Sequence, residues 1–260
     1  MRVCLAVAMG VLMVSMPVLA QEDAAASVPA SPFTFEEQPA APAAATASPI
    51  LAVAKRKASV LVRSAPGAEL KPVTRPTAEV DKKPYRQKPE QPMPFFVLNN
   101  RILPPVMNFA LSGFMGDSTD LRISGAYAAM LRDGYPTLRV SYAPAGSMGW
   151  SGAVWQNPAN NWGTADGGYN LRAARTLNFW ARGARGGEVV SFTCGGTAAN
   201  YPDSDSLVTG EIELSDQWME YVVDLTGVDT RYISAGFGFV AKRELNSDGC
   251  TFFLDDVRYE

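Results

Sequence analysis

Apolar and polar residues alternate with a period of two along the second half of the chain. The run TLRVSYA at 137–143 places Leu138, Val140 and Tyr142 on one side and polar or charged residues on the other. Side chains alternate between two faces along a strand, whereas a helix repeats every ~3.6 residues. Glycine-rich segments separate the runs, so the pattern predicts an antiparallel all-β jelly-roll sandwich. Further strands are predicted at 176–183, 188–196, 217–225 and 250–259, and the only helix-like run is 126–134.

The predicted strand TLNFWARG at 176–183 has one apolar face and one polar face that carries a tryptophan. Asn178, Trp180 and Arg182 share the polar face. An aromatic plane between an amide and a guanidinium suits stacking against a sugar ring. It equally suits a cation–π pair in which Arg182 covers the indole without any ligand. Tyr201, in the loop NYPDSDS, is a candidate for one wall of the same groove.

The stretch GWSGAVWQNPANNWG at 149–163 holds three tryptophans, and it is the second candidate for ligand contact. Its ligand-binding candidates are Trp155, Gln156, Asn160, Asn161 and Trp162. If the strand is regular, Trp155 faces away from both Trp150 and Val154, so at least one of the three tryptophans is expected in the core. The two asparagines have an alternative role, which is to hydrogen-bond the backbone of their own loop.

Composition divides the chain into three zones. Residues 1–20 carry one charge, Arg2, followed by an apolar run that ends in Val18-Leu19-Ala20, as in a cleaved secretory signal. Residues 21–94 hold 12 of the 19 prolines and no tryptophan, which predicts a disordered linker. Residues 95–260 are long enough for one folded domain with a core of its own. We therefore expect an exported protein, periplasmic, at the cell surface or secreted, of bacterial type.

Charge is distributed unevenly over these zones. The linker has a net charge of −4 over 21–50 and +6 over 51–94, and the domain at 95–260 has −6. An acidic domain argues against nucleic acid as a partner. Contact with a membrane or an anionic envelope polymer is possible only through the basic part of the linker, and a solvated linker without such contact is the favoured interpretation.

Histidine is absent and cysteine is rare. Without histidine, Ser-His-Asp and Cys-His catalytic triads are impossible, and the commonest zinc ligand is missing. Two acids such as Asp203 and Asp205 remain the only catalytic candidates, and acids at this spacing in a loop are more typical of solvated turns. In an exported protein Cys194 and Cys250 are candidates for a disulfide, with two buried free thiols as the alternative.

Four motifs together resemble those of a bacterial family of β-sandwich domains. They are SGFMGDSTDL at 112–121, GWSGAVWQNPANNWG at 149–163, the run from GGYNL to FWARG at 167–183, and FLDDVRYE at 253–260. In order and spacing they resemble jelly-roll carbohydrate-binding modules of the galactose-binding-like superfamily. The resemblance covers about 107–260. It implies a non-catalytic monomer that binds a polysaccharide or oligosaccharide.

The same resemblance implies a structural calcium ion, held partly by an acid on the last strand. Asp255 matches that place, and Asp117 is a candidate partner from the exit of an earlier strand. Asp255 and Asp256 are expected to face opposite sides of the sheet. The alternative is that one of them caps a turn or pairs with an arginine such as Arg258.

Taken together, the sequence predicts an exported, non-catalytic glycan-binding module whose exposed aromatic residues stack on sugar rings. The alternative is a structural or interaction protein of the cell envelope that uses the sandwich and the basic linker without binding sugar.

Overall fold

The computed structural model describes residues 56–57, 59–63, 87–99, 101 and 107–260, all within one compact unit, Phe33–Glu260. The predicted signal sequence and most of the predicted linker lie outside these residues. The described residues contain no helix of the length and apolarity that crossing a membrane requires.

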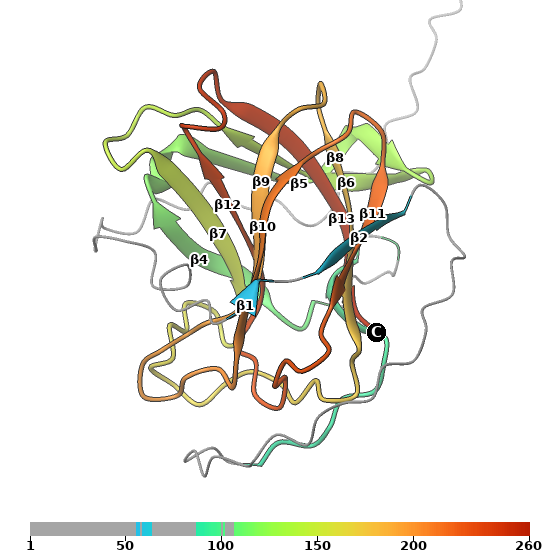
Figure 1. The fold of residues 1–260 in the computed structure, drawn as a ribbon, viewed down its shortest axis with the longest axis vertical. Coiled ribbons are helices and arrows are strands. Elements are labelled where there is room, and N and C mark those ends of the chain that lie inside the picture. The colour runs from blue at the N-terminus through green and yellow to red at the C-terminus, as the bar shows by residue number, and fades with distance from the viewer. Residues whose placement is uncertain (1–55, 58, 64–86, 100, 102–106) are drawn as a thin grey trace, which may run out of the picture. The chain divides into compact units, whose positions relative to one another are not determined.

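Two β-sheets lie one over the other and form a sandwich (Figure 1). Sheet A has the order β1 (Arg56–Lys57), β10 (Ser206–Glu213), β9 (Val189–Gly195), β12 (Ala235–Lys242), β7 (Trp150–Gln156) and β4 (Ala110–Gly116). Sheet B has the order β2 (Val60–Arg63), β11 (Met219–Asp224), β8 (Thr176–Gly183), β13 (Cys250–Tyr259), β6 (Tyr135–Tyr142) and β5 (Leu121–Arg132), and β3 (Phe95–Leu98) pairs with β13. All pairs are antiparallel except β1 with β10. The predicted all-β sandwich is confirmed.

The core lies between the sheets and is built by the alternation seen in the sequence. Phe179 of β8 meets Phe192 of β9 with ring centroids 4.5 Å apart, and Phe252 of β13 meets Phe239 of β12 at 5.2 Å. Each pair joins one sheet to the other. Because these rings fill the inner faces, the residues of opposite parity on β8 and β13 must lie on the outer face of sheet B.

The helix-like run at 126–134 does not form a helix. Its residues lie mainly in β5, which pairs with β6 through two register shifts, one between Ser124 and Tyr127 and one between Tyr127 and Leu131. Irregular pairing of this kind bends a strand. The helix-like interpretation of this run was wrong, because its pattern belongs to a strand with bulged pairing and not to one face of a helix.

Part of the segment predicted as a linker belongs to the sandwich. Arg56–Lys57 pairs with the edge strand β10 of sheet A, and Val60–Arg63 pairs with the edge strand β11 of sheet B. Edge strands offer unpaired N–H and C=O groups, and VLVR at 60–63 has the β-branched content to use them. Residues 87–94 also differ from a free linker, since Glu90 bridges to Asn170.

Candidate functional site

The outer face of sheet B carries aromatic and charged side chains in two neighbouring rows. The first row is Glu220, Trp180 and Asp255, which are directly opposite one another on β11, β8 and β13. In the second row Arg182 lies opposite Phe253, and Phe253 lies opposite Arg139 of β6. This is the polar face of β8 that the sequence predicted, so Asn178, Trp180 and Arg182 do lie together.

Trp180 is covered by an arginine, but not by Arg182. The guanidinium of Arg132, at the end of β5, lies 4.5 Å from the ring centroid of Trp180. The Arg132 side chain is 6% exposed, whereas Trp180 remains partly exposed. A cation over an indole face is a stabilising contact and it leaves less of the ring for a ligand. Trp180 therefore serves first to hold the end of β5, at Arg132, over the outer face of sheet B.

Arg132 also neutralises a buried carboxylate. Its Nε donates to Asp255 Oδ2 at 2.7 Å, and its Nη2 lies 3.3 Å from Asp256 Oδ2. Asp255 is fully buried, and burial raises the pKa of its carboxyl, while Arg132 opposes that rise. We call Arg132, Trp180, Asp255 and Asp256 the Arg132 clamp.

A β-bulge brings the two neighbouring aspartates to one arginine. Asp256 has a φ of 51°, and the register between β13 and β8 shifts between Asp255 and Arg258. The expectation that Asp255 and Asp256 face opposite sides was wrong, because the bulge breaks the alternation on which it rested. The alternative to calcium, in which one of the two aspartates pairs with an arginine such as Arg258, agrees with the 2.8 Å bond from Arg258 to Asp256.

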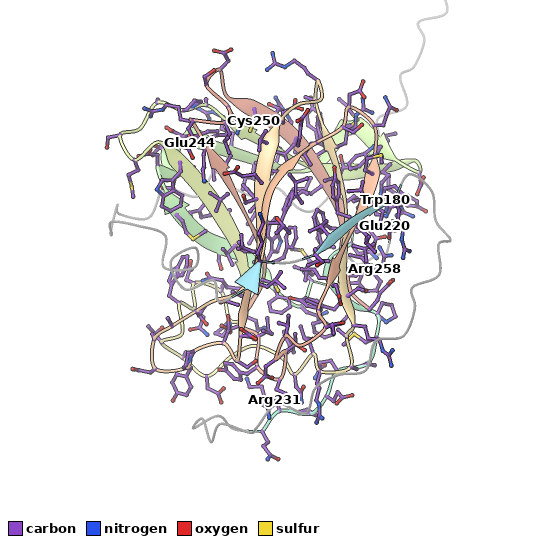
Figure 2. All side chains as sticks on the ribbon, viewed as in Figure 1. Trp180, Glu220, Arg231, Glu244, Cys250 and Arg258 are labelled. Atoms are coloured by element: carbon purple, nitrogen blue, oxygen red, sulfur yellow. The ribbon has the colours of Figure 1, made fainter. Side chains whose placement is uncertain are left out.

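Arg258 links the first row to the C-terminus (Figure 2). It donates to Glu220 at 2.9 Å and to Glu260 at 2.6 Å, and Asn178 donates through its Nδ2 to the other Glu260 oxygen at 2.7 Å. Asn178 is 4% exposed. Its amide therefore fixes the end of the chain, although its buried Oδ1 has no hydrogen-bond partner among the described residues.

The side chains of the second row form fewer hydrogen bonds and ion pairs than those around the first row. Trp218 lies in the turn before β11 and continues this row beside Arg182, because Met219 is opposite Ala181. We call Trp218, Arg182, Phe253 and Arg139 the Arg182 row. Three of its members are partly exposed, and Phe253 is 4% exposed beneath Tyr127, whose ring stacks on it at 5.9 Å. The buried Nε of Arg182 has no hydrogen-bond partner among the described residues.

The β5–β6 hairpin lies over one side of this face. Arg132 reaches Trp180 from it, and Trp218 Nε1 donates to the carbonyl of Leu131 at 3.3 Å. Trp218 comes from the far side of sheet B, next to β11, so these contacts cross the sheet. The hairpin thus forms a wall along the Arg182 row. Neighbouring strands are ~4.8 Å apart, so the row from Trp218 to Arg139 extends for about 14 Å across the strands.

Sequence reasoning missed Trp218, Phe253 and Arg139. The parity of each strand contained the signal, since Arg139 alternates with Leu138 and Val140 in the predicted strand 137–143. What the sequence did not contain was the register that places three separate strands side by side.

The tryptophans of 149–163 do not join this site. Trp155 is 1% exposed and packs on Phe237 in the core, which confirms the prediction that at least one is buried and excludes Trp155 as a ligand contact. Trp150 and Trp162 pack on a small apolar cluster on the outer face of sheet A, around Val154. The predicted ligand residues therefore divide between opposite outer faces of the sandwich.

The amides near Trp162 hold their own loop. Asn161 Oδ1 accepts the N–H groups of Gly163, Thr164 and Ala165, and Asn161 is 2% exposed. Gln156 is fully buried and donates to the carbonyl of Asn161. Both residues were predicted to bind ligand, and their burial excludes that role. Asn160 is exposed, has a φ of 59° and donates its N–H to Ser112 Oγ, as a turn residue does.

Tyr201 is not a wall of the Trp180 groove. Its N–H donates to the carbonyl of Gly163 at 2.8 Å, which places its loop beside that of Trp162. In the same loop Asp203 is 4% exposed and accepts hydrogen bonds from the N–H and hydroxyl of Ser234. Asp203 therefore anchors the loop and is not placed for acid–base chemistry.

Cys194 and Cys250 are free and buried, so the predicted disulfide is wrong. The thiol of Cys194 is a neighbour of Tyr259, which lies nine residues along β13 from Cys250. Nine residues of strand span about 30 Å, far beyond the reach of a disulfide. Burial raises the pKa of each thiol to about 12.

The residues predicted to hold calcium do not fit that ion. Asp255 already faces the positive charge of Arg132 at 2.7 Å, and Asp117 Oδ2 accepts the N–H of Gly149 at 2.8 Å. Calcium requires about six to eight oxygen ligands. Among the described residues, no group of three or more Asp, Glu, Cys or His side chains is arranged to hold a metal. At Asp255 a guanidinium supplies the charge that the resemblance assigned to a metal.

No protein-family model matches the chain, and no curated protein is similar to it in sequence. Its fold is similar to solved carbohydrate-binding modules. A family 11 module of a cellulosomal cellulase of Clostridium thermocellum has 13% identity and a TM-score of 0.42, over 59% of this chain and 88% of that one. A family 30 module from a second cellulosomal cellulase of the same organism has 17% identity and a TM-score of 0.38, over 58% and 90%.

A family 61 module in complex with β-1,4-galactotriose has 14% identity and a TM-score of 0.33, over 57% of this chain and 86% of that one. At such identities and scores the likeness says nothing about ligand or residues. The chain is similar in fold, at low sequence identity, to carbohydrate-binding modules of several families, namely 30, 11, 61 and 29.

Proposed function

We propose that this protein is an exported, non-catalytic glycan-binding module whose ligand lies across the strands of sheet B, along the Arg182 row. One observation carries the proposal: the Arg182 row alternates aromatic and guanidinium side chains across adjacent strands, beside a hairpin wall. A sugar chain presents apolar ring faces and a rim of hydroxyls. Aromatic side chains bind the faces, and guanidinium groups donate to the rim.

The division of labour between the two rows supports this placement. Arg132 and Arg258 are bonded to carboxylates of the first row, and Arg132 covers Trp180. In the second row, Trp218 and Arg182 keep partly exposed surface, although Trp218 and Phe253 also contact the hairpin. The first row therefore carries the ion pairs that fix the hairpin, and the second row keeps the exposed surface that a ligand needs in a preorganised site.

A non-catalytic role agrees with the chemistry of this face. Glycoside hydrolysis uses two carboxyl groups about 5–10 Å apart, one of which must carry a proton or be free to act as a nucleophile. The carboxylates here, Glu220, Asp255 and Asp256, each accept hydrogen bonds from an arginine. All three are therefore already bonded to a guanidinium, unlike the free pair of carboxyl groups that hydrolysis uses.

A glycan array on the mature chain, residues 21–260, tests the proposal, followed by calorimetry on each hit. Trp218→Ala is the test variant and Trp162→Ala is the matched control, because both indoles are partly exposed and lie on opposite faces. We expect a dissociation constant of roughly 10–1000 μM, since a short groove offers few contacts against the cost of ordering a flexible chain. Absence of binding at millimolar glycan would contradict the proposal.

A further inference from the structure

The arginines on the outer face of sheet B fall into two groups. Arg101, Arg132 and Arg258 each form an ion pair with a carboxylate, at distances of 2.6 to 2.9 Å. Arg182 and Arg139 form no ion pair with any described carboxylate. Arg182, Arg139 and Arg258 lie on strands of sheet B, and Arg101 and Arg132 reach the same face at Asp255.

This contrast is unexpected from the charge of the domain. Residues 95–260 contain 18 acidic and 12 basic residues, so carboxylates are in excess. This excess favours ion pairs, and the three paired arginines on this face each meet a carboxylate. Arg182 and Arg139 instead keep their charge unneutralised, and both are partly exposed.

The surroundings of the two guanidinium groups are aromatic. Arg139 lies 5.0 Å from the ring centroid of Tyr127, and Arg182 is flanked along its row by Phe253 and Trp218. Aromatic neighbours hold a guanidinium in place without satisfying its N–H groups. The buried Nε of Arg182 is an example, since it has no partner among the described residues. Arg139 is therefore held against an aromatic ring, and Arg182 keeps unused hydrogen-bonding capacity.

The spacing of these donors suits a repeating anion. Arg182 on β8 and Arg139 on β6 are separated by one strand, β13, so their Cα atoms are about 10 Å apart. A guanidinium binds a carboxylate through two parallel N–H···O bonds, which is its preferred geometry. Two guanidiniums along one row fit a chain that carries carboxylates at intervals.

We propose that the glycan bound along the Arg182 row is a polyuronate, an acidic polysaccharide whose sugar carboxylates pair with Arg182 and Arg139. This inference rests on the proposed glycan binding and names the class of ligand. Trp218 and Tyr127 contact the sugar rings between the carboxylates. Binding of a glycan does not require carboxylates on the sugar, so glycan binding and carboxylate pairing can be tested separately.

The experiment compares polygalacturonate, alginate and the methyl ester of polygalacturonate as calorimetry titrants of the mature chain. The ester has the same backbone and no charge, so it isolates the carboxylates. We expect at least one polyuronate to bind, its binding to weaken as NaCl is raised, and the ester to bind at least tenfold more weakly. Equal affinity for the ester and the acid, or binding to neutral glycans alone, overturns this inference and leaves the proposed function standing. No binding to any acidic or neutral glycan overturns both.

Variants place the effect at the two arginines. Arg182→Gln and Arg139→Gln are each expected to weaken polyuronate binding about tenfold or more and to weaken binding of the ester by a smaller factor, because the ester loses only hydroxyl contacts. Arg182→Lys retains the charge without the two-pronged geometry and should give an intermediate loss. Arg175→Gln is the matched control, because Arg175 is exposed and lies at the other end of β8. An equal loss of binding in the Arg175 variant would show that net charge alone causes the effect, and it would contradict the role of Arg182 and Arg139. Circular dichroism checks that each variant is folded.

Discussion

Arg132 and Asp255 are joined across sheet B by a 2.7 Å hydrogen bond between Nε and Oδ2, with Arg132 almost completely and Asp255 completely buried. They are 123 residues apart in the chain, and their bond ties the β5–β6 hairpin to the last strand. The same guanidinium lies over Trp180. One arginine thus fixes the wall beside the proposed site.

Removing Arg132 leaves the buried Asp255 with Arg101 as its one remaining cation among the described residues, at 3.7 Å instead of 2.7 Å. We predict that Arg132→Gln lowers the free energy of unfolding by about 3–5 kcal/mol, the usual cost of breaking a buried ion pair on one side. Chemical denaturation measures the change. In the matched double variant with Asp255→Asn no buried charge remains, so part of the loss should be recovered. A double variant less stable than Arg132→Gln would contradict a direct pairing.

Calcium should have no effect on the stability of the folded domain. A ligand that binds only the folded state raises the thermal midpoint in proportion to the logarithm of its concentration. Because Arg132 already neutralises Asp255, we predict the same midpoint in excess EDTA and in millimolar CaCl₂. A rise in the midpoint with calcium would show a metal site that the described residues do not reveal.

Trp155 and Trp218 should separate stability from binding. Trp155 is 1% exposed, so Trp155→Ala is predicted to lower the free energy of unfolding by about 3–5 kcal/mol through the cavity it leaves. Trp218→Ala removes a partly exposed ring and should lower stability far less, while reducing glycan affinity. Denaturation curves and calorimetry on both variants decide this. Equal destabilisation by the two variants would contradict the placement of Trp218 on the outer face.

The thiols of Cys194 and Cys250 should be unreactive in the folded protein. Cys194 and Cys250 are buried, and burial raises the pKa of each to about 12, so neither forms a thiolate at neutral pH. We predict no reaction with a thiol reagent under native conditions and reaction of both after unfolding. A reduced and an oxidised sample should have the same mass, and a mass two units lower after oxidation would indicate the disulfide that the structure excludes.

The same thiols make stability depend on alkaline pH. A raised pKa in the folded state means that the unfolded chain ionises first, so the stabilising contribution is complete below about pH 9 and is lost as pH rises towards about 12. We predict a lower urea midpoint at pH 10 than at pH 7.5. The variant with Cys194→Ala and Cys250→Ala should show a smaller decrease, and an identical decrease would assign the effect to tyrosines alone.

The polar face of β8 could be predicted from the sequence because alternation is a local property. Asn178, Trp180 and Arg182 share a face in any regular strand, whatever lies around it. Their neighbours could not be predicted in the same way. Arg132 reaches Trp180 only because β5 is bent by two register shifts, and a bend of that kind has no local signature in the alanine-rich run around it.

Tryptophan content was a weaker guide than strand parity. The cluster at 149–163 drew attention because three indoles lie close in sequence, yet Trp155 packs in the core and Trp162 lies on the outer face of sheet A. Asn161 and Gln156 form hydrogen bonds with the backbone of the loop in which Asn161 lies. Composition does not distinguish such residues from residues that bind a ligand. The disulfide expectation failed similarly, because compartment and cysteine count carry no information on distance.

The most direct test of binding along the Arg182 row is calorimetric titration of residues 21–260, as wild type, Trp218→Ala and Trp162→Ala, with the best glycan from the array. We predict that Trp218→Ala weakens binding about tenfold or more while Trp162→Ala leaves it unchanged, with both variants folded. Loss of binding in Trp162→Ala and not in Trp218→Ala would contradict it, because the ligand would then lie on sheet A.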